Sequence, residues 1–309
     1  MTTEKSLADH TVPVSAFTRP SVVRAWLQDA GLRPNRLLGQ NFLIDGNILR
    51  LLLDTAAVHS SDRILEVGPG LGALTAGLLD RGAHVVAIEK DERFFPLLEE
   101  HLAGYSDRTL IQGDALDFVP GILAQESITK MVANLPYTPG TRILVDIATC
   151  AMRPERIAVM VQDEVAGRIT AEPGTTAFGL LSLWCRVFYR VSYVKRVSPN
   201  CFWPRPKVQS AIVLLERLAE PLVQDAGWPF FMWMTKQLFQ HRRKQMGRLL
   251  SELPISKETN NAQIVDFLPE TCRRLRPEAV PLDVWCTLSE NMRMHVEANQ
   301  GIEGSDHGR

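Results

Sequence analysis

The stretch that decides the fold is Arg63-Ile-Leu-Glu-Val-Gly-Pro-Gly-Leu-Gly72, a short β-rich run that ends in a glycine loop. Glycines at a strand end let the backbone turn tightly and approach a ligand. The nicotinamide dinucleotide fingerprint places its third glycine three positions after the second. Here the spacing is two positions, and the acid Glu66 precedes the loop. The loop favours S-adenosylmethionine over a dinucleotide, although taken alone it also fits a plain strand-to-helix turn.

The sequence on either side of this loop alternates β-rich runs with helical stretches, which predicts an α/β fold with a mostly parallel sheet, Rossmann-like, and helices on both faces. The β-rich runs are Arg63–Val67, His84–Glu89, Thr109–Gln112, Lys130–Asn134 and Arg156–Gln162. A helix is expected from Asp163, and the runs 187–197 and 210–216 are expected as an antiparallel addition to the sheet.

The chain divides by composition into four segments. After residues 219–221 the pattern becomes helical, with Phe231, Met234 and Leu238 at spacings that share one helix face. We therefore expect an N-terminal extension (1–30), the α/β domain (31–218), a small helical domain (228–294) and a disordered tail (295–309).

The overall composition excludes several classes of protein. The chain has 309 residues, with 34 Lys and Arg against 35 Asp and Glu, so a nucleic-acid surface must be a local patch. Its five cysteines form no Cys-x-x-Cys pair, so neither a disulfide framework nor a metal site is expected. No secretory signal and no run of ~20 apolar residues is found. A cytoplasmic protein without a membrane partner is expected.

Two acidic residues follow predicted strands at the edge where open α/β sheets bind ligands. Glu89 ends the second strand roughly 20 residues after the glycine loop, where a carboxylate can accept hydrogen bonds from both ribose hydroxyls. Asp114 follows the third strand and could accept from the adenine amino group. A solvated strand-end acid and an ordinary Gly-Asp turn remain the alternative interpretations.

The tetrapeptide Asn134-Leu135-Pro136-Tyr137 carries the predicted chemistry. An exocyclic aromatic amine is a poor nucleophile, and it improves when its hydrogens are drawn to the Asn134 side-chain oxygen and a backbone carbonyl. Pro136 holds the Leu135 carbonyl in an extended geometry, and Tyr137 supplies a stacking face for the base. Because the sulfonium is already activated, methyl transfer needs positioning and no catalytic base. A proline turn after a buried strand is the alternative.

Two stretches rich in basic residues predict an RNA surface. Residues 173–215 and 236–248 contain no Asp or Glu, and aromatic residues are interleaved in the first stretch. A solvated face of a strand or helix is the alternative for either stretch. The expected RNA-binding residues are Arg186, Arg190, Lys195, Arg196, Lys207, Arg242, Arg243 and Lys244.

Eight landmarks together resemble the ribosomal small-subunit RNA adenine N6,N6-dimethyltransferase family. They are residues 38–43, 66–72, 88–91, 113–115, 134–137, 162–165, 202–210 and 239–244. The resemblance implies that Asn41 and Leu43 contact the cofactor, that Gly68 and Gly70 adjoin it, that Asn134 faces both methyl donor and target amine, and that Phe202 is a second aromatic wall for a flipped adenine. It also implies that 31–218 is the methyltransferase domain and 228–294 an RNA-binding domain.

The function implied by the resemblance is dimethylation of N6 on two adjacent adenines in the 3′-terminal hairpin of small-subunit ribosomal RNA during ribosome assembly. The target adenine must leave its stack to reach Asn134. The partner is then a pre-ribosomal particle, and the enzyme is expected as a monomer. Two alternatives stay open: a large-subunit adenine dimethyltransferase that confers macrolide resistance, and a largely non-catalytic assembly or transcription factor on the same fold.

Overall fold

The computed structural model describes residues 12–35, 39–137, 139–255 and 261–303. The chain forms two compact units. The first contains the described residues up to 166 together with 191–217, and the second contains 167–190 together with the described residues from 218 onward. One division between the units falls between residues 217 and 218, but residues 167–190 group with the C-terminal unit rather than with the rest of 31–218.

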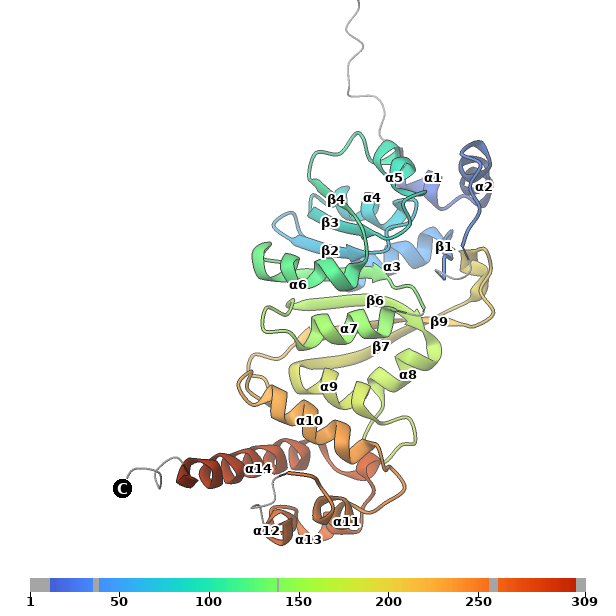
Figure 1. The fold of residues 1–309 in the computed structure, drawn as a ribbon. Coiled ribbons are helices and arrows are strands. Elements are labelled where there is room, and N and C mark those ends of the chain that lie inside the picture. Colours follow the sequence, from blue (N-terminus) through green and yellow to red (C-terminus); the bar gives the residue numbers. More distant parts are fainter. Residues whose placement is uncertain (1–11, 36–38, 138, 256–260, 304–309) are drawn as a thin grey trace, which may run out of the picture. The chain divides into compact units, whose positions relative to one another are not determined.

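A seven-stranded sheet forms the centre of the fold, in the order β4-β3-β2-β5-β6-β9-β7 (Figure 1). The neighbours from β4 to β6 are parallel, and β9 pairs antiparallel with β6. The strands are β2 (Arg63–Val67), β3 (His84–Glu89), β4 (Arg108–Gln112), β5 (Lys130–Asn134), β6 (Arg156–Gln162), β7 (Tyr189–Val197) and β9 (Ser210–Arg217). The predicted α/β fold class and the antiparallel β9 are confirmed.

The helices of the first unit cover both faces of this sheet. In Figure 1, α6 (Ala115–Gln125) and α7 (Gly140–Thr149) lie in front of the sheet, and α3 (Gly46–Ala56) lies behind it. Also on the first unit are α4 (Ala73–Leu79), α5 (Phe95–His101) and the start of α8 (Asp163–Thr170). Asp45 caps α3 by accepting from the N–H groups of Asn47 and Ile48 at 2.9 and 3.1 Å, which satisfies two of its unpaired donors.

A second, two-stranded sheet lies beside the main one. β1 (Phe42–Leu43) pairs antiparallel with β8 (Phe202–Trp203), and the short helix η2 (Pro199–Cys201) precedes β8. From the residues alone, 41–43 fit the start of a helix, so this strand was not predicted. The expected N-terminal extension forms α1 (Val14–Phe17) and α2 (Pro20–Asp29), and residues 1–11 of it lie outside the described residues.

The second unit is helical in its C-terminal part, as expected. It contains α9 (Leu180–Phe188), α10 (Trp228–Phe239), α11 (Met246–Ser251), α12 (Asn261–Asp266), α13 (Glu270–Arg273), η3 (Pro277–Ala279) and α14 (Leu282–Glu303). Phe231, Met234 and Leu238 are all buried, in agreement with their predicted shared face.

The C-terminal tail differs from its prediction. Residues 295–309 were expected to be disordered, but α14 continues to Glu303. Arg293 pairs with Glu290 and Glu297 on this helix, and ion pairs at this spacing support helix past the predicted end. Residues 304–309 lie outside the described part of the chain. No helix among the described residues is both long and apolar enough to cross a membrane.

Candidate active site

A cavity of about 330 Å³ opens at the carboxyl edge of the parallel strands, within the first unit. The glycine loop after β2, the ends of β3 and β5, and the start of α6 all contribute to its lining. Ten of the predicted catalytic and cofactor-binding residues line it: Asn41, Leu43, Gly68, Gly70, Glu89, Asp114, Asn134, Leu135, Pro136 and Tyr137. Its size suits a small ligand, and the sheet edge is the one expected from the strand pattern.

The glycine loop forms one wall of the cavity. Gly68, Gly70 and Gly72 all have positive φ angles, a conformation that glycine adopts without steric cost. A Cβ atom on Gly70 would lie 3.0 Å from the Phe42 ring, and the Gly70 N–H donates to Glu89 at 3.0 Å. The loop is thus fixed against both the N-terminal segment and the end of β3.

Glu66 is a deeply buried acid at the cavity wall. It lines the cavity, is 1% exposed, and its Oε2 has no hydrogen-bond partner among the described residues. Burial raises its pKa to about 8, with a further contribution from the charge of Glu89. A buried acid with an unused acceptor at the wall of a cavity indicates a place for a cationic or donor group of a ligand.

Glu89 ends β3 with both carboxylate oxygens engaged by the backbone. Oε2 accepts from the Gly70 N–H at 3.0 Å, and Oε1 accepts from the Asp91 N–H at 2.8 Å. Burial raises the pKa of this carboxyl, while those two bonds lower it. Each oxygen can still accept a further bond, so the carboxylate is held in place and able to receive two ribose hydroxyls.

Asp114 caps α6 and is paired with a cation that sequence reasoning missed. Its Oδ1 accepts from the Leu116 N–H at 3.0 Å, and its Oδ2 lies 2.5 Å from the Lys90 ammonium. The hydrogen bond from Lys90 holds the pKa of Asp114 below its usual value. The side chain remains an ionised acceptor at the cavity wall.

Asn134 ends β5 with its amide orientation fixed by a distant segment. Its Nδ2 donates to the carbonyl of Asn41 at 3.2 Å. Its Oδ1 has no donor among the described residues, so the oxygen is the free end of the amide. The predicted role of Asn134, accepting an amine hydrogen, requires this orientation.

The three residues after Asn134 continue along the cavity wall. The Gly140 N–H donates to the Pro136 carbonyl at 2.9 Å, and the Leu135 carbonyl keeps its acceptor capacity within the described residues. The Tyr137 hydroxyl lies 2.9 Å from the hydroxyl of Ser210 at the start of β9. Burial raises the pKa of Tyr137. Thr138, where the sequence departs from the family pattern, lies outside the described residues.

Phe202 lies elsewhere than its predicted role suggests. It is 3% exposed, belongs to the hydrophobic core of the first unit and is not among the residues that line the cavity. It pairs with Leu43 across β1 and β8, and Leu43 does line the cavity. Its role as an aromatic wall for the base stays a prediction.

Two cavity residues come from the N-terminal helices, which the sequence marked only as an extension. Phe17 of α1 and Val23 of α2 line the cavity and are each 1% exposed. Val23 and Leu27 share a helix face and pack with Leu71 and Phe94. The four-residue spacing of Val23 and Leu27 was the available signal that α2 covers a core.

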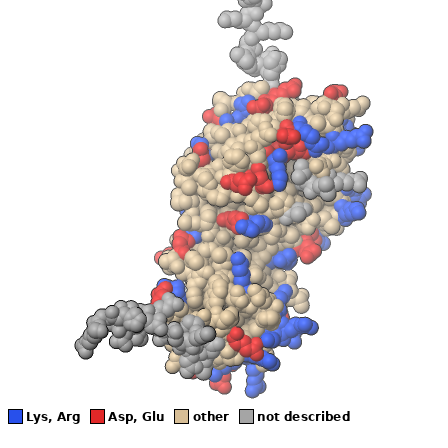
Figure 2. Space-filling view, in the orientation of Figure 1, with Lys and Arg blue, Asp and Glu red and all other residues tan. Residues whose placement is uncertain are grey.

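The predicted RNA-binding residues differ in how freely they can reach a ligand. Lys195, Lys207 and Arg243 have no partner among the described residues. Arg196 pairs with Asp163 at 3.1 Å, and Lys244 with Glu252 at 2.7 Å. Figure 2 shows basic and acidic side chains interspersed on the face displayed.

Two arginines of the second unit are held by backbone carbonyls. Arg186 donates to the carbonyl of Thr170 at 2.8 Å and to Glu172 at 2.5 Å. Arg242 donates to the carbonyls of Thr176 and Phe178. Arg190, in β7, is exposed. Arg186 therefore also contributes to local structure, whatever its contribution to RNA binding.

The fold and the cavity together define an S-adenosylmethionine-dependent methyltransferase. The residues present fit that cofactor: Glu66 provides an unused buried acceptor for a cationic group, Glu89 a carboxylate for a ribose diol, and Asp114 an acceptor at the start of α6. These groups lie along one continuous cavity.

The chain belongs to the ribosomal RNA adenine dimethylase family, which matches residues 31–267. It is 39% identical over 274 residues to "Ribosomal RNA small subunit methyltransferase A" of Opitutus terrae, covering 87% of this chain and 97% of that protein. It is 40% identical over 227 residues to the protein of the same name from Clostridium botulinum strain Kyoto, covering 73% and 82%. The small-subunit name thus recurs in both relatives.

Solved structures agree with this fold. A dimethyladenosine transferase from Plasmodium falciparum superposes with a TM-score of 0.71 at 22% identity, covering 81% of this chain and 97% of that one. The 23S rRNA methyltransferase ErmE gives 0.57 at 26% identity, covering 82% and 100%. The first similarity supports the fold alone.

Proposed function

We propose that this enzyme dimethylates N6 of two adjacent adenines in the 3′-terminal hairpin of small-subunit ribosomal RNA, in a pre-ribosomal particle in the cytoplasm, and acts as a monomer. The observation that carries the proposal is the geometry at Asn134, whose Nδ2 is bonded to the Asn41 carbonyl so that Oδ1 faces no other donor. The names of the two bacterial relatives support the small subunit as substrate.

The chemistry follows from what the wall residues can accept and hold. Bound S-adenosylmethionine supplies a methyl group on an activated sulfonium. Asn134 Oδ1 and the Leu135 carbonyl accept the two hydrogens of the target amine, which increases the tetrahedral character of the nitrogen. The Tyr137 ring, anchored through Ser210, gives the adenine a stacking surface. One amine hydrogen remains after the first transfer, so the same acceptors can orient the monomethylated amine for the second transfer.

The two competing assignments differ from this proposal in different ways, the first in substrate and the second in lacking catalysis. A large-subunit enzyme would share the cavity and the tetrapeptide, and ErmE resembles this chain in fold. The relatives at 39 and 40% identity carry the small-subunit name instead. A non-catalytic assembly factor has no need for the free acceptor on Asn134.

The test uses purified full-length protein and labelled S-adenosylmethionine. The substrates are small and large ribosomal subunits from a strain that lacks the enzyme. We expect label in small-subunit RNA, recovered as N6,N6-dimethyladenosine, with only transient monomethyladenosine. The Asn134→Ala variant is the control for enzyme-dependent label. Label mainly in large-subunit RNA would assign the protein to the resistance enzymes, and tight particle binding without label would support an assembly factor.

A further inference from the structure

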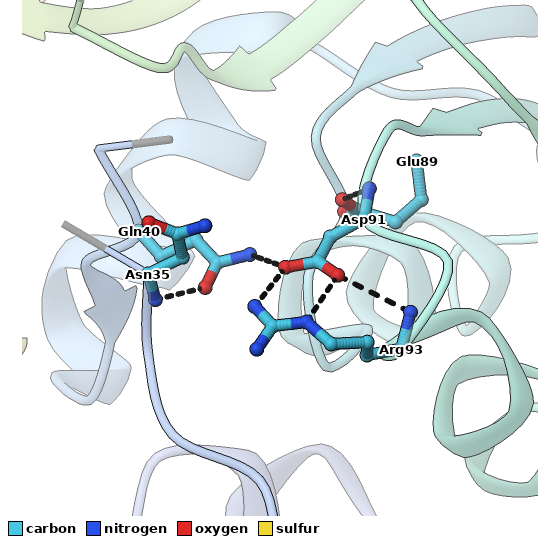
Figure 3. Close-up of polar contacts among 5 residues, drawn as sticks. All are labelled: Asn35, Gln40, Glu89, Asp91 and Arg93. Carbon is cyan, nitrogen blue, oxygen red and sulfur yellow. Dashed lines mark hydrogen bonds and ion pairs between the residues drawn. The ribbon is translucent and has the colours of Figure 1, made fainter. Parts of the chain in front are cut away.

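Gln40 and Asp91 belong to two of the sequence landmarks, yet no role has been assigned to either. They form one hydrogen-bonded cluster with Asn35, Glu89 and Arg93 (Figure 3). Gln40 Nε2 donates to Asp91 Oδ2 at 2.8 Å, and Gln40 Oε1 accepts from the Asn35 N–H at 2.6 Å. Both ends of the Gln40 amide are used, so its orientation is determined by its partners.

Asp91 is a fixed anchor for this contact. It is 5% exposed, and Arg93 donates to both carboxylate oxygens, from Nε at 2.8 Å and Nη2 at 2.6 Å. A two-pronged arginine bond of this kind restricts the carboxylate in both position and plane. The backbone N–H of Asp91 donates to Glu89 Oε1 at 2.8 Å. Gln40 is therefore attached to the loop that positions the predicted ribose acceptor.

On its other side, the segment that carries Gln40 contacts the catalytic tetrapeptide. The carbonyl of Asn41 accepts from Asn134 Nδ2 at 3.2 Å. The backbone of Gly39 lies against that of Tyr137, since a Cβ at Gly39 would meet the Tyr137 nitrogen at 3.4 Å. The residues 39–41 thus connect the end of β3 to the end of β5, across the cavity wall.

We propose that Gln40 is a positioning residue: anchored on the Asp91–Arg93 pair, it holds the Asn41 carbonyl where that carbonyl fixes the amide of Asn134 for methyl transfer. The inference rests on the proposed function only in one respect: the rate measured below is the rate of methyl transfer to small-subunit RNA. Without the anchor, the Asn41 carbonyl moves and the Asn134 amide can rotate, so that Oδ1 and Nδ2 exchange places. Gln40 lines the cavity, but both ends of its amide are bonded within the chain, to Asp91 and to the Asn35 N–H. It therefore acts on the reaction through Asn41 and Asn134.

The experiment compares Gln40→Met, which keeps the length of the side chain and removes its donor, with Gln40→Lys, which restores a donor to Asp91. Gln28→Met on the exposed side of α2 is the matched control. Three quantities are measured: hydrogen exchange of residues 39–43, the dissociation constant of S-adenosylmethionine, and the single-turnover rate at saturating cofactor and small subunits.

For Gln40→Met we expect faster exchange in 39–43 and a rate lower by about a hundredfold, since small misplacements near reacting groups have effects of that size. The dissociation constant should rise by at most about tenfold, the size of one lost hydrogen bond. Gln40→Lys should recover most of the rate and slow the exchange again.

Unchanged exchange, or a dissociation constant that rises as much as the rate falls, would refute the positioning role. Failure of Gln40→Lys to recover either quantity would do the same. If the wild-type protein methylates no ribosomal RNA, the proposed function fails separately. The exchange of 39–43 in the Met and Lys variants would then still decide whether Gln40 anchors the segment.

Discussion

The buried charged residues at the two ends of the parallel strands differ in how fully they are hydrogen-bonded within the chain. At the amino edge, Asp62 and Lys130 are each 8% exposed and form an ion pair at 2.6 Å. Asp62 also accepts from Thr129 and from the His59 N–H, and Lys130 donates to the Ala57 carbonyl. Both charged groups of this pair therefore have partners within the chain.

At the carboxyl edge, some polar side-chain atoms have no partner among the described residues. Glu66 is more deeply buried than Asp62, yet its Oε2 has no partner among the described residues and its pKa is raised to about 8. Asn134 Oδ1 is likewise unused. Buried polar groups that are satisfied hold a fold together, whereas those with spare capacity mark where a ligand completes them. The comparison predicts that substitutions at the amino edge reduce stability and those at the carboxyl edge reduce binding or rate.

The largest effect should come from the amino edge. Lys130→Met leaves the Asp62 carboxylate buried without its cation, which should lower the free energy of unfolding by about 3 to 5 kcal/mol. Urea denaturation measures this. Arg142→Met is the control, because the Arg142–Asp146 pair is exposed and should change stability by less than about 1 kcal/mol. Equal losses for the two variants would contradict the proposed difference between buried and exposed pairs.

At the carboxyl edge, Asn134→Ala should lower the single-turnover methylation rate by about 100- to 1,000-fold, the effect of removing one oriented acceptor or donor from a transition state. The free energy of unfolding and the affinity for small subunits should stay close to wild type. Fluorescence titration and denaturation test both. A rate within tenfold of wild type would exclude Asn134 from the chemistry.

Glu89→Ala should weaken S-adenosylmethionine binding by roughly 1.5 to 3 kcal/mol, the value of hydrogen bonds to a charged group. Isothermal titration calorimetry gives this directly. The control is Glu92→Ala, an exposed glutamate on the following turn, which should bind normally. If the two variants bind equally well, Glu89 does not hold the ribose.

Glu66 makes cofactor binding depend on pH. Its carboxyl is protonated below about pH 8 in the free protein, and a cationic ligand group favours the ionised form. Affinity should therefore fall by up to about tenfold per pH unit as the pH drops from 8 toward 6. Glu66→Gln should remove this dependence, and calorimetry in buffers of different ionisation enthalpy should show proton release at pH 7 in wild type alone.

The same group affects the stability of the free protein in the opposite sense. Between its ordinary pKa of 4.5 and its raised value of about 8, the unfolded chain is ionised while the folded chain is protonated. Stability is therefore highest below the lower value and declines as the pH rises through the upper one. Thermal unfolding of Glu66→Gln should lack that decline. A parallel decline in both proteins would mean that another group is responsible.

The smallest effect is expected from removing the hydroxyl of Tyr137. Tyr137→Phe keeps the ring and loses only the bond to Ser210, a change of about 0.5 to 1.5 kcal/mol, so most of the activity should remain. Ser210→Ala should have an effect of the same size, and the double variant should be no worse than either. Tyr137→Ala should be nearly inactive. A Phe variant as inactive as the Ala variant would mean that the hydroxyl takes part in the chemistry.

Local sequence patterns predicted the strands and the side chains at their ends. The strands β2, β3, β5 and β6 have the predicted bounds, and the acid and amide at the ends of β3 and β5 reach the cavity, because side chains at strand ends follow from strand position alone. The Lys90–Asp114 pair was missed because its geometry depends on how two loops approach each other.

The contacts that sequence reasoning missed join segments far apart in the chain. Phe42–Leu43 becomes a strand only through Phe202–Trp203, so two residues of local sequence gave no strand signal. The hydrogen bond between Tyr137 and Ser210 was missed because it also joins residues far apart in the chain. Phe202 was assigned to the base pocket through the family resemblance, and its pairing with Leu43 in β1 is a contact that no local pattern contains.

The pairing of β1 with β8 also orders events during synthesis. Phe42 and Leu43 leave the ribosome early, but their partners follow only when residue 203 has emerged. At about 5 to 20 residues per second, that interval is on the order of ten seconds. Within this interval the glycine loop and Glu89 emerge and can fold with the nascent sheet, while the wall that Leu43 provides is still unpaired. A newly made chain should therefore be unable to retain the methyl donor until residue 203, two thirds of the way along the 309 residues, has emerged from the ribosome.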